Sequence, residues 1–296
     1  MTKVALVSCR MLGGLDEQDA PLPAALAQVG LEAEVTFWDD PDVRWEQYAL
    51  AVIRSPWDYF RRYPEFLAWL DRIEQATSLW NPPAFLRWNS HKRYLLGLEA
   101  LGVPVVPTLL LTRGIPVSLA HAAGARGWED VVLKPAVAAG AFRTLHHRDV
   151  NAPDAQQHLD ALLKDVDVLL QPYQAQVSAS REQSLIYIDG QLMQGLQKEA
   201  VFDIPADAPQ IVAGAARARI TPTQPTGEQR ALAERALASV PVESLLYARV
   251  DMVRGEDGAM RLMELEAFDP SLYLKTFPHL ARALAEAISR RVASTT

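Results

Sequence analysis

The chain has 296 residues, enough for two or three packed layers or about two domains, and its 49% apolar residues suffice for a large core. Its 29 basic and 36 acidic residues give a net charge of −7, which argues against binding of nucleic acid or of an anionic membrane surface. No stretch approaches the roughly 18 apolar residues of a membrane span, and no signal-peptide pattern is visible. With Cys9 as its one cysteine, which we expect to be a buried thiol at a strand end, a cytoplasmic location is expected.

The first part of the chain alternates strands with helices. Strands are predicted over residues 3–9, 32–38 and 48–55, and helices over residues 21–30 and 61–76. This alternation favours a parallel α/β unit that extends from residue 1 to about residue 88.

The second part reads differently, with strands that follow one another. It opens with a predicted helix that Asn89 or Ser90 caps and that ends at Gly102. Strands or strand pairs are then expected over 103–111, 129–149, 166–174, 181–200 and 245–268. We also expect an exposed loop over 203–210 and helices over 227–238 and 278–292. Asp189-Gly190 is the turn of the hairpin over 181–200. This half is therefore predicted to be α+β, with antiparallel strands.

The last hairpin can be registered from its turn. Asp257-Gly258 is typical of a two-residue type I′ turn. That turn places Glu256 opposite Ala259, Asp251 opposite Glu264, and Arg249 opposite Glu266, with all four inner charges on one face and Val250, Met252, Met263 and Leu265 on the buried side.

Like charges that face each other across a ladder are unfavourable. Two carboxylates at ~4 Å repel by about 4 kcal/mol at an effective dielectric constant of ~20. Arg249 can pair with Glu266, but Asp251 and Glu264 still face each other, so a bound divalent cation would explain the set. This set of charged residues contains no Cys or His, which favours Mg²⁺ over zinc as the cation. The alternative is an acidic strand face whose carboxylates diverge into water.

Three segments suggest nucleotide binding. Lys134 ends an apolar strand, and the small residues of "AVAAGAFRT" after it let backbone N–H groups approach phosphate oxygens. Lys92 lies in the first turn of a predicted helix. "LLQPYQ" is a proline-containing strand exit whose free backbone groups can bind an adenine edge. Each also has an ordinary interpretation: a strand–loop–strand with one lysine, a solvated helix lysine, and a simple strand exit.

Taken together, the ordered series "NSHKRYL", "VVLKP", "LLQPY", "REQSLIYIDGQLMQGLQK", "YARVDMV" and "LMELEAFDPSLYL" resembles the ATP-grasp superfamily over roughly residues 88 to 280. The resemblance implies an ATP-grasp fold preceded by a parallel α/β domain, with ATP and Mg²⁺ as cofactors. The implied domains are an N-terminal α/β substrate domain over 1–88, a lid subdomain over 89–170 and a catalytic domain over 171–296.

The resemblance also implies roles for individual residues. Lys92 and Lys134 would hold nucleotide phosphates, Gln171, Pro172 and Tyr173 would cradle adenine, Glu182 would bind ribose or a nearby group, and Lys198 would reach the γ-phosphate. Asp251, Glu264 and Glu266 match the Mg²⁺ ligands, and Arg249 matches the arginine that steadies the tetrahedral intermediate. The last metal position is often Asn in this superfamily, and the loop over the phosphates usually has more glycines than Gly140 alone.

Substrate specificity is expected at the carboxyl ends of the N-terminal strands. One end carries Asp16, Glu17 and Asp19, and the other carries Arg54, Ser55, Trp57 and Asp58. An arginine fork and an acidic group would suit the two charges of an amino acid. Arg217 and Arg219 are further candidates for a substrate carboxylate or phosphate. Turn capping and surface charge are the alternatives for all of these residues.

The segments "RSPWDYFRRYPEFLAWL" and "WNPPAFLRWNSHKRYL" resemble a narrower group, related to glutathione synthetase, that includes D-cycloserine synthetase. This implies that ATP activates the carboxylate of O-ureido-D-serine and that the alkoxyamine nitrogen closes the ring, with release of CO₂ and ammonia. The open alternatives are an intermolecular amino-acid or peptide ligase, a kinase that stops at phosphorylation, and a nucleotide-binding regulator without activity. A homodimer also stays open.

Overall fold

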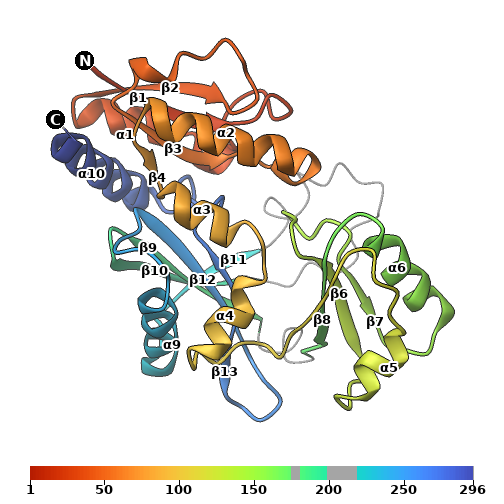
Figure 1. Cartoon of the computed structure of the whole chain (residues 1–296). Helices are drawn as coiled ribbons and strands as arrows, with labels where there is room; N and C mark the ends of the chain where they lie inside the picture. The colour runs from red at the N-terminus through yellow and green to blue at the C-terminus, as the bar shows by residue number, and fades with distance from the viewer. Residues whose placement is uncertain (175–180, 199–218, 296) are drawn as a thin grey trace.

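The computed structural model describes residues 1–174, 181–198 and 219–295, which form three sheets with their covering helices. Figure 1 shows the N-terminal sheet at the top, the C-terminal sheet below it, and the middle sheet with its two helices on the right. The described residues therefore combine one parallel sheet with two antiparallel ones, as predicted.

The N-terminal sheet is parallel, with the strand order β2-β1-β3-β4. Its strands are β1 (Thr2–Ser8), β2 (Leu31–Phe37), β3 (Leu50–Ser55) and β4 (Leu79–Trp80). The central strands are buried on both faces, which is why they read as continuous apolar runs. The covering helices are α1 (Leu22–Gln28), α2 (Tyr63–Ala76) and the C-terminal α10 (Pro278–Thr295), which packs against α1. Short 3-10 turns, Glu17–Asp19, Trp45–Gln47 and Tyr59–Arg62, complete this part.

The connection to the middle sheet differs from the prediction. Instead of one helix capped by Asn89 or Ser90, there are two, α3 (Pro83–Asn89) and α4 (Tyr94–Ala100). Asn89 ends the first helix, and its buried side chain donates to the Leu265 carbonyl at 2.8 Å and accepts from the Ala267 N–H at 3.2 Å. The asparagine is used to attach the helix to the C-terminal sheet, so it cannot cap the next helix. Lys92 accordingly lies in the break between the helices.

The middle sheet is antiparallel, with the strand order β5-β8-β6-β7. Its strands are β5 (Leu109–Leu111), β6 (Val131–Pro135), β7 (Leu145–His147) and β8 (Val168–Pro172). Two helices that the sequence analysis did not predict, α5 (Leu119–Gly124) and α6 (Pro153–Leu163), cover it. Sheet and helices bury a hydrophobic core of their own, separate from the other cores.

The C-terminal sheet is antiparallel, with the strand order β11-β10-β9-β12-β13. Its strands are β9 (Glu182–Ile188), β10 (Gln191–Lys198), β11 (Ile220–Thr223), β12 (Tyr247–Arg254) and β13 (Met260–Glu266). Asp189 and Gly190 both have positive φ, 50° and 76°, which confirms the predicted type I′ turn. Helix α9 (Gly227–Ala238), at the predicted place, begins with a capping box formed by Thr226 and Gln229.

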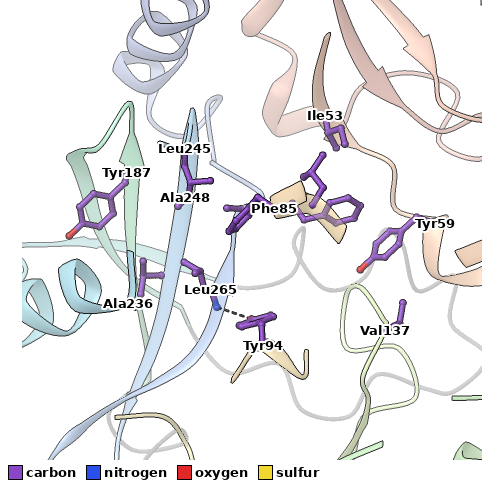
Figure 2. Close-up of a cluster of buried hydrophobic side chains, with 14 of the residues drawn as sticks. Ile53, Tyr59, Phe85, Tyr94, Val137, Tyr187, Ala236, Leu245, Ala248 and Leu265 are labelled. Carbon is purple, nitrogen blue, oxygen red and sulfur yellow. Dashed lines mark hydrogen bonds between the residues drawn. The ribbon is translucent and has the colours of Figure 1, made fainter. Parts of the chain in front are cut away.

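One large core connects the N-terminal sheet with the C-terminal sheet. Figure 2 shows Ile53 and Tyr59 on one side, Phe85 in the middle and Leu265 on β13 beyond it. The Tyr94 hydroxyl accepts a hydrogen bond from the Leu265 N–H at 2.9 Å in the same cluster. A second core joins β1, β3 and α1 to α10. The N-terminal and C-terminal sheets are thus packed as one body.

The final hairpin reaches the predicted register by another route. The Gly255 N–H donates to the Ala259 carbonyl at 2.8 Å, and Gly258 has a φ of +81°, so the loop has three residues rather than the two of a type I′ turn. A bulge between Asp251 and Met252, with Met263 as the extra residue on β13, then restores the pairing of Asp251 with Glu264 and of Arg249 with Glu266. Met263, predicted on the buried side, is only partly buried and packs against Val106 and Val253.

Candidate active site

The face of the C-terminal sheet that carries the predicted charges holds a dense network of ion pairs. Arg249 and Asp251 from β12 lie opposite Glu266 and Glu264 from β13, as the register predicted. In the ladder between β12 and β9, Asp251 pairs with Ser184, so this serine shares the face. Sequence reasoning missed Ser184 because nothing in an alternating strand marks one serine as functional.

Asp251 is the most strongly held carboxylate of the network. It is 1% exposed, and it accepts hydrogen bonds from Arg249 Nη2 at 2.8 Å, Lys198 Nζ at 3.1 Å and Ser184 Oγ at 2.6 Å. Burial alone would oppose its charge, but Arg249 and Lys198 hold the pKa of Asp251 well below its ordinary value. Asp251 is therefore ionised at any physiological pH.

Arg249 connects three groups. Besides Asp251, it contacts Glu266 Oε1 with Nη2 at 2.6 Å and donates from Nη1 to the Ser271 carbonyl at 3.0 Å. The ring of Tyr273 lies 6.0 Å from its guanidinium carbon. Burial works against the charge of Arg249, but Asp251 and Glu266 raise its pKa. Such a guanidinium is fixed in place rather than free to swing.

Lys198, at the end of β10, pairs with Glu182 and Asp251 and is 8% exposed. Burial and Arg249 oppose the charge of Lys198, but Asp251 and Glu182 raise its pKa. Burial raises the pKa of Glu182 to about 7, although the neighbouring Lys198 favours its charged form. The predicted ribose ligand and the predicted γ-phosphate ligand are thus paired with each other.

Glu264 receives the two lysines that were predicted to hold phosphates. Lys134 Nζ donates to its Oε1 at 3.0 Å, and Lys92 Nζ lies 3.7 Å from its Oε2. Burial opposes ionisation, but Lys92 and Lys134 lower the pKa of Glu264 to about 2. Burial raises the pKa of Glu266 against the opposing effect of Arg249. The structure therefore brings Lys92, Lys134 and the acidic strand together in one place.

These ion pairs correct one step of the sequence argument. The repulsion between neighbouring carboxylates was expected to require a bound cation, but Arg249, Lys134 and Lys198 of the chain itself form ion pairs with them. Within the part of the chain that the structure describes, no three His, Cys, Asp or Glu side chains are arranged to hold a metal ion. Asp251, Glu264 and Glu266 share a face without forming a ready-made cage.

The donor set nevertheless fits Mg²⁺. Mg²⁺ is bound through one or two carboxylates when phosphate oxygens and waters complete its shell. The side chains of Glu264 and Glu266 are 19% and 28% exposed, so both can reach a ligand from solvent. All the acids on this face are hard oxygen donors, and neither imidazole nor thiolate is among them.

The small-residue loop after Lys134 contacts this network through Lys92. Lys92 donates from Nζ to the Ala138 carbonyl at 3.0 Å and from its backbone N–H to the Ala136 carbonyl at 2.7 Å. Gly140, the predicted glycine of the loop, has a φ of +59°, and Ala141 and Arg143 also adopt left-handed φ values of 61° and 52°. The loop therefore makes tight turns with few glycines, at some cost in backbone strain.

The predicted adenine segment forms the end of β8. Gln171 is buried and donates from Nε2 to Thr108 Oγ1 at 2.8 Å, and Pro172 pairs with Val131 in the ladder. The Tyr173 N–H donates to the Asp130 carbonyl at 2.9 Å, and its ring stacks on His146 at 3.8 Å between centroids. The Gln171 side chain thus serves packing within the sheet, and the Tyr173 N–H is used within the protein.

The N-terminal residues predicted to bind substrate mostly bind one another. Arg54 is fully buried and forms a two-point ion pair with Asp19, at 3.1 and 3.0 Å. Asp16 caps the turn Glu17–Asp19, and its backbone N–H donates to Ser55 Oγ at 3.2 Å. Asp58 accepts from Trp38 Nε1 at 2.7 Å and from Arg62 at 3.0 Å. Arg219 is exposed, and Arg217 lies outside the described residues.

Residues 267–271, which we call the strap, follow β13 directly. They lie in the segment "LMELEAFDPSLYL", but no role was predicted for them. Each of its five carbonyls accepts a hydrogen bond from a side chain: Ala267 from Asn81 (2.6 Å), Phe268 from Tyr247 (3.2 Å), Asp269 from Trp57 (3.3 Å), Pro270 from Arg54 (3.0 Å) and Ser271 from Arg249 (3.0 Å). The predicted substrate residues Arg54 and Trp57 are thus connected to the strap. Contacts to backbone carbonyls leave no sequence pattern, so they could not be predicted.

Comparison with known proteins places the chain. The model of the N-terminal domain of D-cycloserine synthetase DcsG matches residues 4–81. The cycloserine biosynthesis protein DcsG of Streptomyces lavendulae is 32% identical over 300 residues, which cover 98% of this chain and 98% of that protein. The chain belongs to the D-cycloserine synthetase family. As in that family, it is an ATP-grasp ligase, which supports the use of ATP and Mg²⁺ in general terms.

Solved structures agree with the D-cycloserine synthetase assignment. The crystal structure of D-cycloserine synthetase DcsG superposes with a TM-score of 0.86 at 31% identity, over 98% of this chain and 99% of that chain. D-Alanyl-alanine synthetase A from Vibrio cholerae has a TM-score of 0.65 at 15% identity, over 99% of this chain and 98% of that chain, which shows a shared fold alone. Among the described residues, no helix is long and apolar enough to cross a membrane.

Proposed function

We propose that this protein is an ATP- and Mg²⁺-dependent ligase that activates a carboxylate as an acyl phosphate and joins it to a nitrogen. We further propose that it closes the ring of O-ureido-D-serine to give D-cycloserine. The observation that carries the proposal is the network of Lys92, Lys134, Lys198 and Arg249 on the acidic face of β12 and β13. The relative DcsG, named for cycloserine biosynthesis, supports the choice of substrate.

The reaction consists of two transfers. The substrate carboxylate attacks the γ-phosphorus of ATP, the bond to the bridging oxygen breaks, and ADP leaves. The substrate nitrogen then attacks the acyl carbon and loses a proton, the C–O bond to phosphate breaks, and inorganic phosphate leaves with the electron pair. Water finally cleaves the bond between this nitrogen and the carbamoyl carbon, and the carbamoyl group leaves as CO₂ and ammonia. When bound, Mg²⁺ would neutralise charge on the transferring phosphoryl group, and Asp251, Glu264 and Glu266 are the carboxylates that would hold it.

The cations of the network suit the first transfer. Lys92 and Lys134 now rest on Glu264, and Lys198 rests on Glu182 and Asp251. Phosphate oxygens would draw the lysine ammonium groups from these carboxylates, which would be left free for the cation. One set of ion pairs is thereby exchanged for another.

Arg249 suits the second transfer. Attack on the acyl carbon places negative charge on the carbonyl oxygen, and a donor that is already in position stabilises that charge without rearrangement. Asp251, Glu266 and the Ser271 carbonyl hold the guanidinium from three sides. We therefore assign Arg249 to the oxyanion of the tetrahedral intermediate, and the adenine to the backbone of Gln171, Pro172 and Tyr173.

Glu264→Gln tests the proposal directly. The variant keeps the shape of the side chain and removes the charge that pairs with two lysines. We expect ADP release with O-ureido-D-serine to fall at least about 100-fold, because the Mg²⁺–phosphate complex loses a ligand. Glu256→Gln, at an exposed position in the loop of the same hairpin, is the matched control and should retain activity.

Product mass decides between the alternatives. A cyclic product confirms the cyclo-ligase, a condensed product would indicate an intermolecular ligase, and a stable phosphorylated product would indicate a kinase. Tight ATP binding without ADP release, for any carboxylate substrate tested, would favour a nucleotide-binding regulator. Full activity of the Glu264→Gln variant would refute the proposed metal site.

A further inference from the structure

The junction between the N-terminal sheet and β13 contains one acidic side chain with no role so far, that of Asp269 on the strap. We propose that the Asp269 carboxylate binds the α-ammonium group of an amino-acid substrate and so selects α-amino acids. This inference rests on the proposed function, because it names the group that recognises the substrate of the same site.

The strap is held in a way that fixes the position of Asp269. Its own carbonyl is bound by Trp57, the next by Arg54 and the one after by Arg249. Arg54 in turn is fixed by its buried ion pair with Asp19. A backbone held at consecutive carbonyls cannot rotate freely, so the Asp269 side chain is presented from a rigid support, as recognition of a small ligand requires.

The Asp269 side chain itself is open to a ligand. It is partly exposed, and no hydrogen bond or ion pair joins it to any of the described residues, whereas its backbone oxygen is used. Burial, together with the nearby charge of Glu266, raises the pKa of Asp269 to about 7 against the opposing effect of Lys92 and Arg249. A cationic group beside this carboxyl would therefore stabilise its charged form.

Nearby acids that could bind an ammonium group are already engaged. Asp19 is paired with Arg54, Asp58 with Arg62 and Trp38, and Glu17 with Lys275. Asp16 caps a turn through its side chain. The acids first predicted for substrate therefore have partners, and Asp269 is the one at this junction that lacks them among the described residues.

The position also suits the geometry of an α-amino acid. The ammonium nitrogen and the carboxylate that is activated are attached to the same carbon, so their binding groups must be neighbours. Asp269 follows Glu266 by three residues, and Ser271 presents its carbonyl to Arg249. The Ser271 hydroxyl is buried and has no hydrogen-bond partner in the described structure, so a second polar group of the strap remains available to a ligand.

Two substrates and one variant test this assignment. O-Ureido-D-serine is compared with 3-(ureidooxy)propanoate, the same molecule without its amino group, in calorimetric binding and in ADP release. For Asp269→Asn we expect Kd and KM for O-ureido-D-serine to rise about 30-fold, the effect of losing one charge-assisted hydrogen bond, with a smaller change in kcat. For the analogue, wild type and variant should agree within about threefold.

Controls separate recognition from folding. Asp42→Asn, at an exposed turn, should change neither value, and Asp269→Ser should behave like Asp269→Asn. Thermal unfolding and ADP affinity of the Asp269 variants should match wild type. An equal loss on both substrates, no loss on either, or a wild type that binds both equally would overturn the inference. If O-ureido-D-serine binds without ADP release, the proposed function fails, but the calorimetric comparison still decides the role of Asp269.

Discussion

At the scale of single residues, Arg54 binds a carboxylate as predicted, but that carboxylate belongs to the protein and not to a substrate. The sequence analysis gave its guanidinium fork a substrate carboxylate, and in the structure the fork binds the carboxylate of Asp19 and the carbonyl of Pro270. The ring of Tyr247 lies 4.8 Å from its guanidinium carbon and completes the enclosure. We infer that Arg54 acts on substrate through the strap rather than by contact.

Replacing Arg54 should therefore reduce stability first. Arg54→Met leaves the buried Asp19 carboxylate without its partner and frees a strap carbonyl, so we expect a loss of about 3 to 5 kcal/mol in the free energy of unfolding. Urea denaturation measures it. Arg10→Met, which removes an exposed ion pair with Asp40, is the control and should change the free energy of unfolding by less than about 1 kcal/mol.

A double variant checks the cause. Arg54→Met combined with Asp19→Leu removes both charges, so it should recover a large part of the lost stability. A double variant no more stable than Arg54→Met would mean that the strap carbonyl, and not the unpaired Asp19 charge, accounts for the loss.

His158, beside the middle sheet, is expected to make the free energy of unfolding depend on pH. It lies on α6, with Nδ1 3.0 Å from His147 Nε2 and Nε2 3.1 Å from the Arg143 carbonyl. Burial, with His147, lowers the pKa of His158 to about 4, below the ordinary value of 6.5. Between these values the unfolded chain binds more protons than the folded chain, so stability is full above pH 6.5 and falls as the pH drops toward 4.

The size of this effect is set by a partly exposed group, so we expect about 1 to 2 kcal/mol between pH 6.5 and pH 4. His158→Gln should remove this part of the pH dependence, as measured by urea denaturation at both pH values. His279→Gln, at an exposed position on α10, is the matched control, and its free energy of unfolding should change between the two pH values as in wild type. An unchanged slope in the His158 variant would contradict the assignment.

At the scale of elements, the hairpin of β12 and β13 shows what a strand pattern can and cannot predict. The pairing of Asp251 with Glu264 followed from period-two alternation, and it is confirmed. The predicted loop was one residue too short, which alone would shift the register by one residue. The bulge at Met263 restores the predicted register before the chain reaches Glu264 and Glu266. A bulge depends on neighbours distant in sequence, here the Leu262 backbone bonded to Pro104 and Val106, so it was invisible in the hairpin itself.

The helices divide in the same way. Helix α9 lies where it was predicted, and the structure shows that Thr226 and Gln229 form a local start signal there. Helix α3 was missed, since its end depends on Asn89 bonding to β13 rather than on any local cap. Within the candidate site, charged residues in apolar strands could be found from the sequence. The strap could not, because its contacts involve backbone oxygens.

At the scale of the whole molecule, two hydrophobic cores cross between the N-terminal and C-terminal sheets, while the middle sheet has a core of its own. Asn81, fully buried, adds hydrogen bonds to the Tyr247 and Ala267 carbonyls and to the Leu246 N–H. Shared apolar burial makes neighbouring parts unfold cooperatively. The three-part domain division stays a prediction, and these cores suggest that its first and last parts behave as one.

Hydrogen exchange in urea tests this coupling. Peptides from β1 and β3 should lose protection at the same urea concentration as peptides from β9 and β12, because their cores are continuous. The tryptophans of the N-terminal core, Trp38, Trp45 and Trp69, provide a fluorescence signal at the same midpoint. Peptides from β6 and β8 are the internal comparison and are free to unfold separately. Distinct midpoints for β3 and β12 would refute the coupling.

The strap has a mechanical consequence. Side chains from β3, the loop after β3, β12 and the segment between β4 and α3 hold all five of its carbonyls. The surface that would present the amino acid and the strand that would present the cation therefore form one rigid body. The part of the chain that carries the middle sheet contacts this rigid body partly through ion pairs and ring contacts, such as Lys134 with Glu264 and Phe142 with Phe60. Any motion that admits nucleotide would then be a motion of the middle sheet, which would close toward the other two sheets while they stay in place.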